Sequence, residues 1–420
     1  MPMPRSSARP RAAVAGPLLD SGLNSGFCLR RLLSVAVAAA ALVAVPAHGM
    51  KSPHVVVTAD PAHPPEVVAP IALLVDVNSG RVLFERQSHR RFVPASLTKI
   101  MTSYVAFELA SQGKLKLDAV FPMRPETFRQ WHGVGSTMFL ENNSQTRVAD
   151  LLEGIVTVSA NDACVVLAEG VSGNVPGFTA LMNAQARALG MRDTHYNTPN
   201  GWMDEGRTYV SAADLATLST ALITRHPDFY RRFYGRETMI WNGIEQRNHN
   251  PLYGVVTGAD GVKTGFTNEA GYGLVGSATR NGRRLMMVIG GYDRPQDRAR
   301  DGAALLEWGF AAFDETPLFA AGSHIGSARV QRGTVTSVGL VAPRPLALLV
   351  PHGQKVRPTL SIRYKGPLRA PIAKGQDVAV LVVRAPGQPE ARLPLAAAEA
   401  VPPGGPLDRL RNGFAAMVGQ

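Results

Sequence analysis

Three short motifs bring together the side chains of this chain that are best suited to nucleophilic chemistry: S-x-x-K at residues 96–99, S-x-N at 159–161 and K-T-G at 263–265. A serine hydroxyl is a weak nucleophile until a base takes its proton. Ser96 and Lys99 share one helix face because they lie three residues apart. A lysine that is buried near a second cation, such as Lys263, loses its proton more readily and can act as that base. The motifs therefore predict a nucleophilic serine served by a lysine.

The order and spacing of the motifs carry more weight than any one of them. The chain contains a second S-x-x-K at residues 111–114 and a second S-x-N at 172–174, whereas K-T-G occurs once. An isolated S-x-x-K is usually part of a solvated helix face, and the second copies fall in segments that are typical of turns. Only the joint pattern favours a catalytic site.

The second and third motifs add groups that a peptide substrate needs. Ser159 and Asn161 are expected at the start of a helix, where the hydroxyl can relay a proton and the amide can hold a carbonyl group. Lys263 and Thr264 on a strand would place a charge and a hydroxyl along a cleft. Gly265 is expected to leave room for the backbone of the substrate.

The segments around the motifs predict an α+β domain. A hairpin at 71–85 comes first, and helices are expected at about 96–110, 150–158, 162–169, 178–189 and 212–224. Strands are expected at 261–267, 271–279 and 283–289, the last two joined by the hairpin signal Asn281-Gly282, and a helix at 297–313. Helices between strands at both ends imply a helical subdomain with an antiparallel sheet, which we assign to residues 69–318.

A second, smaller domain is expected to follow. Short runs of Val, Leu and Ile alternate with Gly and Pro over residues 319–400, which predicts an all-β module without a catalytic set of its own. Residues 401–420 fit either a short amphipathic helix that anchors the chain to a membrane or a frayed C-terminal tail.

The N-terminus indicates export. Arg30-Arg31 precede an apolar run that ends at Val45 and is followed by small residues, which is typical of a secretory signal peptide and is assigned to residues 1–49. Residues 50–68, rich in Pro, Val and His, are expected to form an extended linker. Only Cys28 and Cys164 occur, so the chain without its signal cannot form an internal disulfide.

Charge and motif content exclude several functions. The net charge is +12, of which +8 belongs to residues 50–420, but no run of Lys and Arg with interleaved aromatic residues occurs, so nucleic acid is not an expected partner. G-x-G-x-x-G at residues 271–276 lies within a predicted strand and not between a strand and a helix, which argues against a dinucleotide. His132 and His195 lack metal-ligand spacing, so no metal is expected.

Taken together, these motifs resemble those of the low-molecular-mass penicillin-binding proteins that act as serine-type D-Ala-D-Ala carboxypeptidases. The resemblance extends to Pro94-Ala95 before the nucleophile, to Asp260-Gly261-Val262 before K-T-G, and to residues 135–140, 182–183, 188–191, 200–201 and 306–310. It implies a β-lactamase/penicillin-binding transpeptidase-like catalytic domain, no cofactor, and two kinds of ligand, peptidoglycan stem peptides and β-lactam antibiotics. It also implies a periplasmic protein that is peripheral to the inner membrane through its C-terminal tail.

The resemblance further implies a role for each residue of the motifs. Ser96 would be acylated by the carbonyl of the penultimate D-Ala, with Lys99 as the general base. Ser159 would relay the proton to the leaving amine, Lys263 would support that relay electrostatically, and Asn161 would hold the peptide.

The remaining implied roles concern the oxyanion and the terminal carboxylate. The backbone N–H groups of Ser96 and Phe266 would form the oxyanion hole. Thr264 and an arginine would bind the carboxylate. Counting back from Trp308 favours Arg294 for this arginine, with a one-residue insertion, and Arg298 is the alternative. Phe266 stands where many relatives carry His, and neither this change nor Ala160 in place of Gly removes a reactive group.

The leading hypothesis is therefore a D-Ala-D-Ala carboxypeptidase that trims pentapeptides. A D,D-endopeptidase of the same fold is the nearest alternative, and the C-terminal β module favours the carboxypeptidase. A β-lactamase has less support because no E-x-x-x-N-type segment lies between S-x-N and K-T-G. A non-catalytic wall-binding protein would not need Ser96, Lys99, Ser159 and Lys263, all of which are present.

Overall fold

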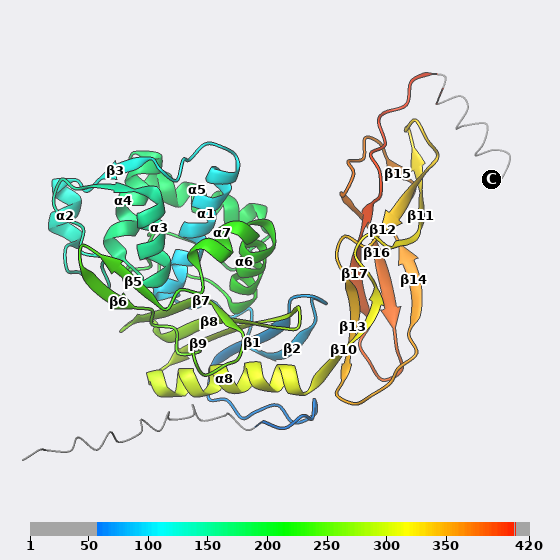
Figure 1. The fold of residues 1–420 in the computed structure, drawn as a ribbon, viewed down its shortest axis with the longest axis horizontal. Helices are drawn as coiled ribbons and strands as arrows, with labels where there is room; N and C mark the ends of the chain where they lie inside the picture. Colours follow the sequence, from blue (N-terminus) through cyan, green and yellow to red (C-terminus); the bar gives the residue numbers. More distant parts are fainter. Residues whose placement is uncertain (1–56, 407, 409–420) are drawn as a thin grey trace, which may run out of the picture. The chain divides into compact units, whose positions relative to one another are not determined.

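The computed structural model describes residues 57–406 and 408, and a five-stranded sheet is the framework of its first domain (Figure 1). The strand order is β2-β1-β9-β8-β7, and all neighbouring strands are antiparallel. The strands are β1 (Ile71–Asp76), β2 (Val82–Arg86), β7 (Ala259–Thr267), β8 (Gly271–Arg280) and β9 (Arg283–Tyr292). Because β1 pairs with β9, the segment between β2 and β7 must fold back onto the sheet.

The predicted turn at Asn281-Gly282 joins β8 and β9. Both residues have positive φ angles, 50° and 82°, as a two-residue hairpin of this sequence requires. The hairpin sets the register of the two strands that follow β7, and β7 carries the K-T-G motif.

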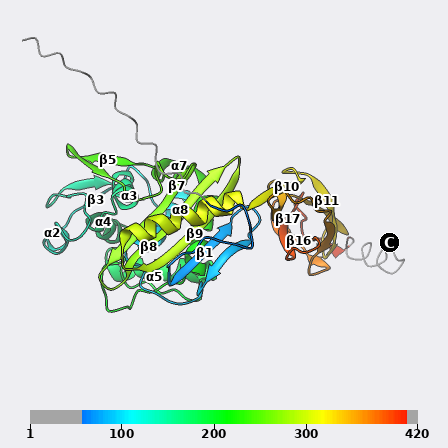
Figure 2. The same ribbon diagram turned by 90° about the horizontal axis from the view of Figure 1, so that it is seen from below.

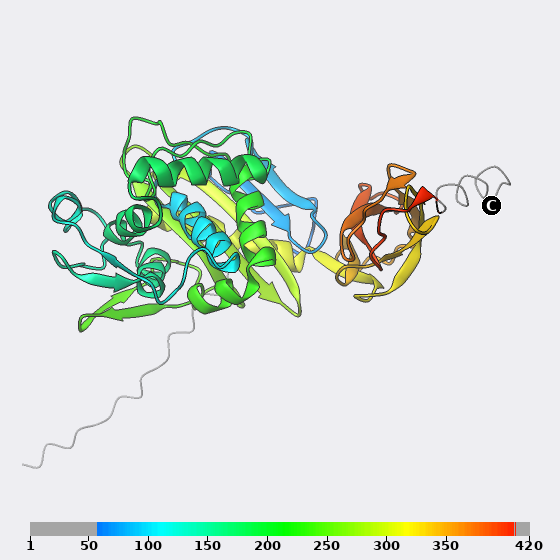
Figure 3. The same cartoon turned by 90° about the horizontal axis from the view of Figure 1, so that it is seen from above.

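One face of the sheet is covered by the helices of the middle of the chain (Figure 3). They include η1 (Ala95–Thr98), α1 (Lys99–Ser111), α3 (Val148–Thr157), α4 (Asn161–Ser172), α5 (Val175–Ala188) and α6 (Ala212–Arg225). α1, drawn in cyan, lies among the others, and every residue from Lys99 to Phe107 is buried. Its sequence is apolar on nearly all sides, as expected for a helix inside a core.

α8 (Pro295–Ala311) crosses the other face of the sheet (Figure 2). Leu305, Leu306 and Trp308 are buried there among residues of the strands. The predicted helix over 297–313 has the observed length but is shifted by two residues, since α8 begins at Pro295 and ends at Ala311. Arg283 donates to the carbonyl oxygens of Gly309 (2.9 Å) and Phe313 (2.7 Å), which caps the helix end, and Phe313 starts a strand instead.

Residues 57–68, which belong to the extended linker expected at 50–68, are attached to the first domain. The Val67 side chain is buried, and the Val68 N–H donates to the carboxylate of Asp301 in α8 at 2.8 Å. The indole N–H of Trp308 donates to the carbonyl oxygen of Asp60 at 3.0 Å. This segment is therefore packed against α8 as part of the domain, while residues 50–56 lie outside the described residues.

Several short elements had no sequence-based prediction. They comprise two helices and two antiparallel strand pairs: α2 (Pro125–Trp131), α7 (Pro227–Phe233), β3 (Val120–Pro122) with β4 (Gln145–Arg147), and β5 (Thr238–Trp241) with β6 (Ile244–Arg247). Each is shorter than the window over which hydrophobic periodicity becomes visible.

The second domain contains only strands, as predicted, but its first strand starts at Phe313 and not at 319. The strands are β10 (Phe313–Phe319), β11 (His324–Gln331), β12 (Ser337–Val341), β13 (Leu346–Pro351), β14 (Thr359–Arg363), β15 (Leu368–Arg369), β16 (Asp377–Arg384) and β17 (Ala391–Ala397). Six of them form a sheet of order β14-β16-β17-β12-β11-β15, and β10 pairs with β13. Leu340, Leu381, Leu393 and Leu395 belong to its separate core.

The two terminal segments fall mostly beyond this description. The expected signal peptide at 1–49 and most of the expected tail at 401–420 lie outside the described residues. Within the described ranges, no single helix is long and apolar enough to cross a membrane, and α4 with α5 meets those criteria only as a pair bent by 88°.

Candidate active site

Ser96 lies in the short turn η1, directly before the buried helix α1. Ala95 opens the turn with a φ angle of 48°, and the Leu97 N–H donates to the carbonyl oxygen of Pro94 at 3.1 Å. Lys99 is the first residue of α1. This geometry places the Ser96 Oγ 2.8 Å from the Lys99 Nζ.

The Lys99 amine is enclosed by three oxygen atoms. Its Nζ lies 2.8 Å from Ser96 Oγ, from Asn161 Oδ1 and from the carbonyl oxygen of Asn200. Only 1% of the residue is exposed. A neutral amine donates two hydrogen bonds and accepts one, so the amide and carbonyl oxygens can take its two protons while its lone pair faces the Ser96 hydroxyl. The arrangement suits a base.

Burial favours this neutral form. Loss of water around the amine lowers the pKa of Lys99 to about 8, although the nearby Cys164 and Asp162 act in the opposite direction. Burial likewise holds the pKa of Lys263 well below its usual range, and the charge of Lys99 lowers it further. The Lys263 Nζ donates to the carbonyl oxygen of Thr264 at 2.9 Å. Two buried amines thus share one region, and the charge of Lys99 disfavours a positive charge on Lys263.

The S-x-N motif forms the turn that leads into α4. Ser159 has a φ angle of 63°, and Asn161 is the first residue of the helix. The Asn161 N–H donates to the carbonyl oxygen of Ser136 (2.7 Å), and its side-chain amide donates to that of Val134 (3.0 Å). The amide of Asn161 therefore links Lys99 to the 134–136 segment and is fixed in orientation.

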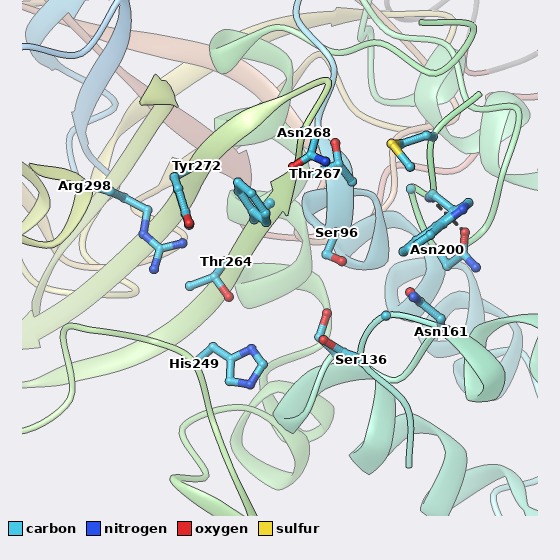
Figure 4. Close-up of a pocket in the computed structure, with 17 residues that line it drawn as sticks. Ser96, Ser136, Asn161, Asn200, His249, Thr264, Thr267, Asn268, Tyr272 and Arg298 are labelled. Atoms are coloured by element: carbon cyan, nitrogen blue, oxygen red, sulfur yellow. Dashed lines mark hydrogen bonds between the residues drawn. The ribbon is translucent and has the colours of Figure 1, made fainter. Parts of the chain in front are cut away.

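A pocket of about 510 Å³ opens over these groups (Figure 4). Ser96 stands between Asn161 and Asn200 on one side and Thr264, Tyr272 and Arg298 on the other. The lining includes all three motifs through their residues Ser96, Ser159, Asn161, Thr264 and Gly265. Phe266, the residue after K-T-G, also lines it, with 47% of its surface exposed.

Two glycines let neighbouring segments approach the nucleophile turn. Gly201 has a φ angle of 72°, and a Cβ there would lie 1.8 Å from the carbonyl oxygen of Ala95. A Cβ on Gly265 would lie 2.7 Å from the carbonyl oxygen of Pro94 and 3.1 Å from Leu97. Gly265 was expected to leave room for the backbone of the substrate; the structure adds a second need for glycine there, because a side chain would meet the nucleophile turn.

Comparison with known proteins identifies the family of this site. Residues 58–293 match the family model described as D-alanyl-D-alanine carboxypeptidase, and residues 313–403 match the C-terminal domain of penicillin-binding protein 5. The chain belongs to the D-alanyl-D-alanine carboxypeptidase family. It is 37% identical over 329 residues to the D-alanyl-D-alanine carboxypeptidase DacA of Haemophilus influenzae, and the match covers 77% of this chain and 83% of that relative.

Solved structures of penicillin-binding proteins resemble this family member in fold. Penicillin-binding protein 5 from Haemophilus influenzae is 36% identical, with a TM-score of 0.68, over 81% of this chain and 99% of that protein. Penicillin-binding protein D2 from Listeria monocytogenes, solved with bound ampicillin, is 29% identical, with a TM-score of 0.53, over 59% of this chain and 99% of that protein. The predicted fold class, a penicillin-binding catalytic domain followed by an all-β domain, is confirmed.

Of the two arginines considered for the carboxylate of the substrate, the structure favours the alternative, Arg298, because it lines the pocket. Arg294 is the residue before α8, its side chain is 71% exposed, and it pairs with Asp297 at 2.6 Å. Arg298 lies one turn further along α8, is 8% exposed and lines the pocket. The count back from Trp308 favoured a residue one helical turn before the arginine that lines the pocket.

Several pocket residues of this carboxypeptidase family member were given no role from the sequence, among them Ser136, Asn200, Trp202, His249 and Tyr272. Asn200 contacts Lys99 through its backbone carbonyl, which leaves no mark in a side-chain pattern. His249 also lines the pocket, and burial of its ring, with the charges of Lys263 and Arg298, lowers its pKa. Its place beside Lys263 and Arg298 could not be read from a single histidine between two asparagines.

Proposed function

We propose that the protein removes the terminal D-Ala from peptidoglycan stem peptides that end in D-Ala-D-Ala, through an acyl-enzyme on Ser96. The observation that carries this proposal is the 2.8 Å contact between Ser96 Oγ and the buried amine of Lys99, in a pocket whose wall also contains the cation Arg298. A serine, a neutral amine and a carboxylate-binding cation are the groups that this exopeptidase reaction requires.

In the first half of the reaction, neutral Lys99 takes the proton of Ser96 while Oγ attacks the carbonyl carbon of the penultimate D-Ala. The backbone N–H groups of Ser96 and Phe266 stabilise the oxyanion that forms. When the C–N bond breaks, Ser159 gives its proton to the leaving nitrogen and recovers one from Lys99. D-Ala leaves, and the shortened peptide remains as an ester of Ser96.

In the second half, water attacks the ester carbonyl and Lys99 again takes a proton. The bond between the acyl carbon and Ser96 Oγ breaks, and Oγ regains its proton from Lys99. The products are the shortened peptide with a free carboxylate and the regenerated serine, so no cofactor enters the balance.

The wall around Arg298 supports recognition of the terminal carboxylate. Thr264 and Arg298 both line the pocket, and the described residues include no carboxylate that pairs with Arg298. Asp297, the acidic neighbour of Arg298 in the sequence, forms its ion pairs with Arg294 and Arg300 instead. A buried cation of this kind gains most when a ligand brings the missing negative charge.

β-Lactam antibiotics fit the same chemistry. Ring opening transfers the acyl carbon to Ser96, but the broken amide stays attached to the adduct, so no leaving group departs. The Listeria monocytogenes protein solved with ampicillin supports this part of the proposal.

We further infer that the protein acts outside the cytoplasm, at the surface of the inner membrane. The pattern of residues 1–49 supports export, and the apolar and basic residues of 405–420 support attachment to a membrane.

The test of the activity uses purified residues 50–420 and two peptides, one ending in D-Ala-D-Ala and one ending in D-Ala-L-Ala. We expect free D-Ala from the first peptide and no cleavage of the second. Ser96→Ala should abolish release, whereas Ser111→Ala, in the second S-x-x-K motif, should leave it unchanged. Release that survives in Ser96→Ala would overturn the proposal, and cleavage only of cross-linked dimers would replace it with an endopeptidase.

A further inference from the structure

Arg298 has fewer hydrogen-bond and ion-pair partners than Arg283, the other buried arginine among the described residues. Arg283 donates to the carboxylate of Asp76 at 2.8 Å and to two carbonyl oxygens. Arg298 makes one long hydrogen bond, from Nη1 to the carbonyl oxygen of Gly273 at 3.4 Å, and its Nε has no partner among the residues described. Hydrogen bonds alone therefore do not fix the direction of the Arg298 guanidinium.

Nearby charged groups do not replace the missing partner. The positive charge of Arg298 lowers the pKa of Lys263 and of His249, which favours the neutral forms of these two side chains. Before a substrate arrives, no carboxylate among the described residues pairs with Arg298. Another contact must hold the arginine against the pocket wall.

An aromatic pair provides that contact. The guanidinium carbon of Arg298 lies over the ring of Tyr272, 5.4 Å from its centre. Tyr272 in turn stacks on Phe266, with ring centres 4.1 Å apart and planes inclined by 23°. Phe266 and Tyr272 are direct cross-strand partners of β7 and β8. A cation over an aromatic ring is attracted by the electrons of the ring, and this attraction is strongest where water is excluded.

We propose that Tyr272, supported by Phe266, is a positioning residue that holds Arg298 in the orientation that receives the C-terminal carboxylate of the substrate. The inference rests on the proposed carboxypeptidase function and concerns its selectivity. Phe266 and Ser96 both line the pocket, and the turn η1 that contains Ser96 packs against β7 and β8. The ring partner of Phe266, Tyr272, carries the arginine, so the β7–β8 hairpin links the carboxylate site to the wall against which the serine turn packs. We therefore expect the enzyme to select substrates that carry a free carboxylate one residue beyond the cleaved bond.

The test compares two peptides that differ only at the C-terminus, D-Ala-D-Ala with a free carboxylate and the same peptide as its C-terminal amide. The measured quantity is the ratio of kcat/KM for the two. Removal of the ring in Tyr272→Leu should lower this ratio about tenfold, mainly through a higher KM for the free acid. Tyr272→Phe keeps the ring and should restore the ratio. Phe266→Leu, which removes only the support, should lower it about threefold.

A double-mutant cycle separates positioning from a general change of the pocket. In Arg298→Gln the ratio should already be lost, and adding Tyr272→Leu should change it no further. Tyr209→Leu is the matched control, because it removes a similar contact, with Arg91 at 4.9 Å from the ring centre, away from the pocket. This variant should leave the ratio as it is in the wild type.

The outcomes distinguish this inference from the function on which it rests. If the wild type releases no D-Ala, the carboxypeptidase proposal fails. If it does, but Tyr272→Leu slows both peptides equally or adds its effect to that of Arg298→Gln, the positioning role alone is wrong. Should Tyr272→Leu not fold, Phe266→Leu decides the question, because an unchanged ratio in that variant overturns the role of the stack.

Discussion

Lys99 and Lys263 place two amines in the interior of one domain, where a charge is costly. The two side chains are 1% and 5% exposed. Proteins rarely bury lysines without a carboxylate partner unless the neutral amine has a use. Here the neutral amine of Lys99 has such a use, because its lone pair can receive the proton of the Ser96 hydroxyl.

The first prediction concerns pH. Only neutral Lys99 can take the proton, and burial lowers its pKa from 10.5 to about 8. kcat/KM for a D-Ala-D-Ala peptide should therefore rise about tenfold per pH unit below pH ~8 and level off above it. Initial rates at low substrate concentration from pH 5.5 to 10 would show this limb. A limb near 10.5, the ordinary value for lysine, would contradict the assigned base.

A second prediction separates the two arginines of α8. Arg298→Gln removes the buried cation that receives the carboxylate and should lower kcat/KM about a hundredfold, mostly through KM. Arg294→Gln alters a side chain that is 71% exposed and should change kcat/KM less than about threefold. Both variants should unfold at nearly the same temperature as the wild type. An equal loss in the two variants would speak against the corrected assignment.

At the scale of the elements, the active site depends on close packing around the turn η1. This turn lies between β7 and the segment that contains Gly201, and both approach it closely. The carbonyl of Asn200, next to that glycine, is one of the oxygens around Lys99. The base is therefore oriented by a backbone segment that only a glycine lets into place.

The third prediction tests this close approach. Gly201→Ala should slow acylation by a fluorescent penicillin at least tenfold, because its Cβ would lie 1.8 Å from the carbonyl oxygen of Ala95 and must displace the turn. Gly190→Ala is the matched control, since Gly190 has a similar φ angle of 77° but open space around its Cβ position. It should cost stability without slowing acylation. Equal acylation rates in both variants would rule out the steric explanation.

For the whole molecule, sequence patterns predicted the long elements and the order of the motifs. The helices and strands that contain many apolar residues were found because they have enough length for a period to be visible. The short elements α2, α7 and β3–β6 were missed for the opposite reason. The attachment of residues 57–68 to the domain was missed because their partners lie in α8, far away in the sequence. Val67 is buried in the same core cluster as residues of α8, and the Val68 N–H donates to Asp301 of that helix.

The sequence predicted the parts of the site that consist of side chains within recognisable motifs. Ser96, Lys99, Ser159 and Asn161 fall within spaced motifs, and the structure brings them together. The contribution of Asn200 is a backbone carbonyl. The place of Arg298 depends on how α8 packs against β8, which a count along the chain does not give. The stack of Phe266 on Tyr272 depends on the register of β7 and β8, which only the folded sheet defines.

The fourth prediction concerns the complete chain in its cell. If residues 405–420 attach the protein to a membrane, deletion of that segment should move the processed protein from the membrane fraction to the soluble fraction. Its rate of acylation by penicillin should stay the same, because the pocket lies entirely within the first domain. Retention of the truncated protein in the membrane fraction would contradict attachment through this tail.

The most direct measurement maps the covalent bond itself. Purified residues 50–420 would be mixed with benzylpenicillin, quenched, digested and analysed by mass spectrometry. We expect one opened penicillin on the peptide that contains Ser96, no adduct in Ser96→Ala, and strongly slowed formation in Lys99→Ala at pH 7. An adduct on another serine, or undiminished acylation of Lys99→Ala, would contradict the assignment of Ser96 as the nucleophile and Lys99 as its base.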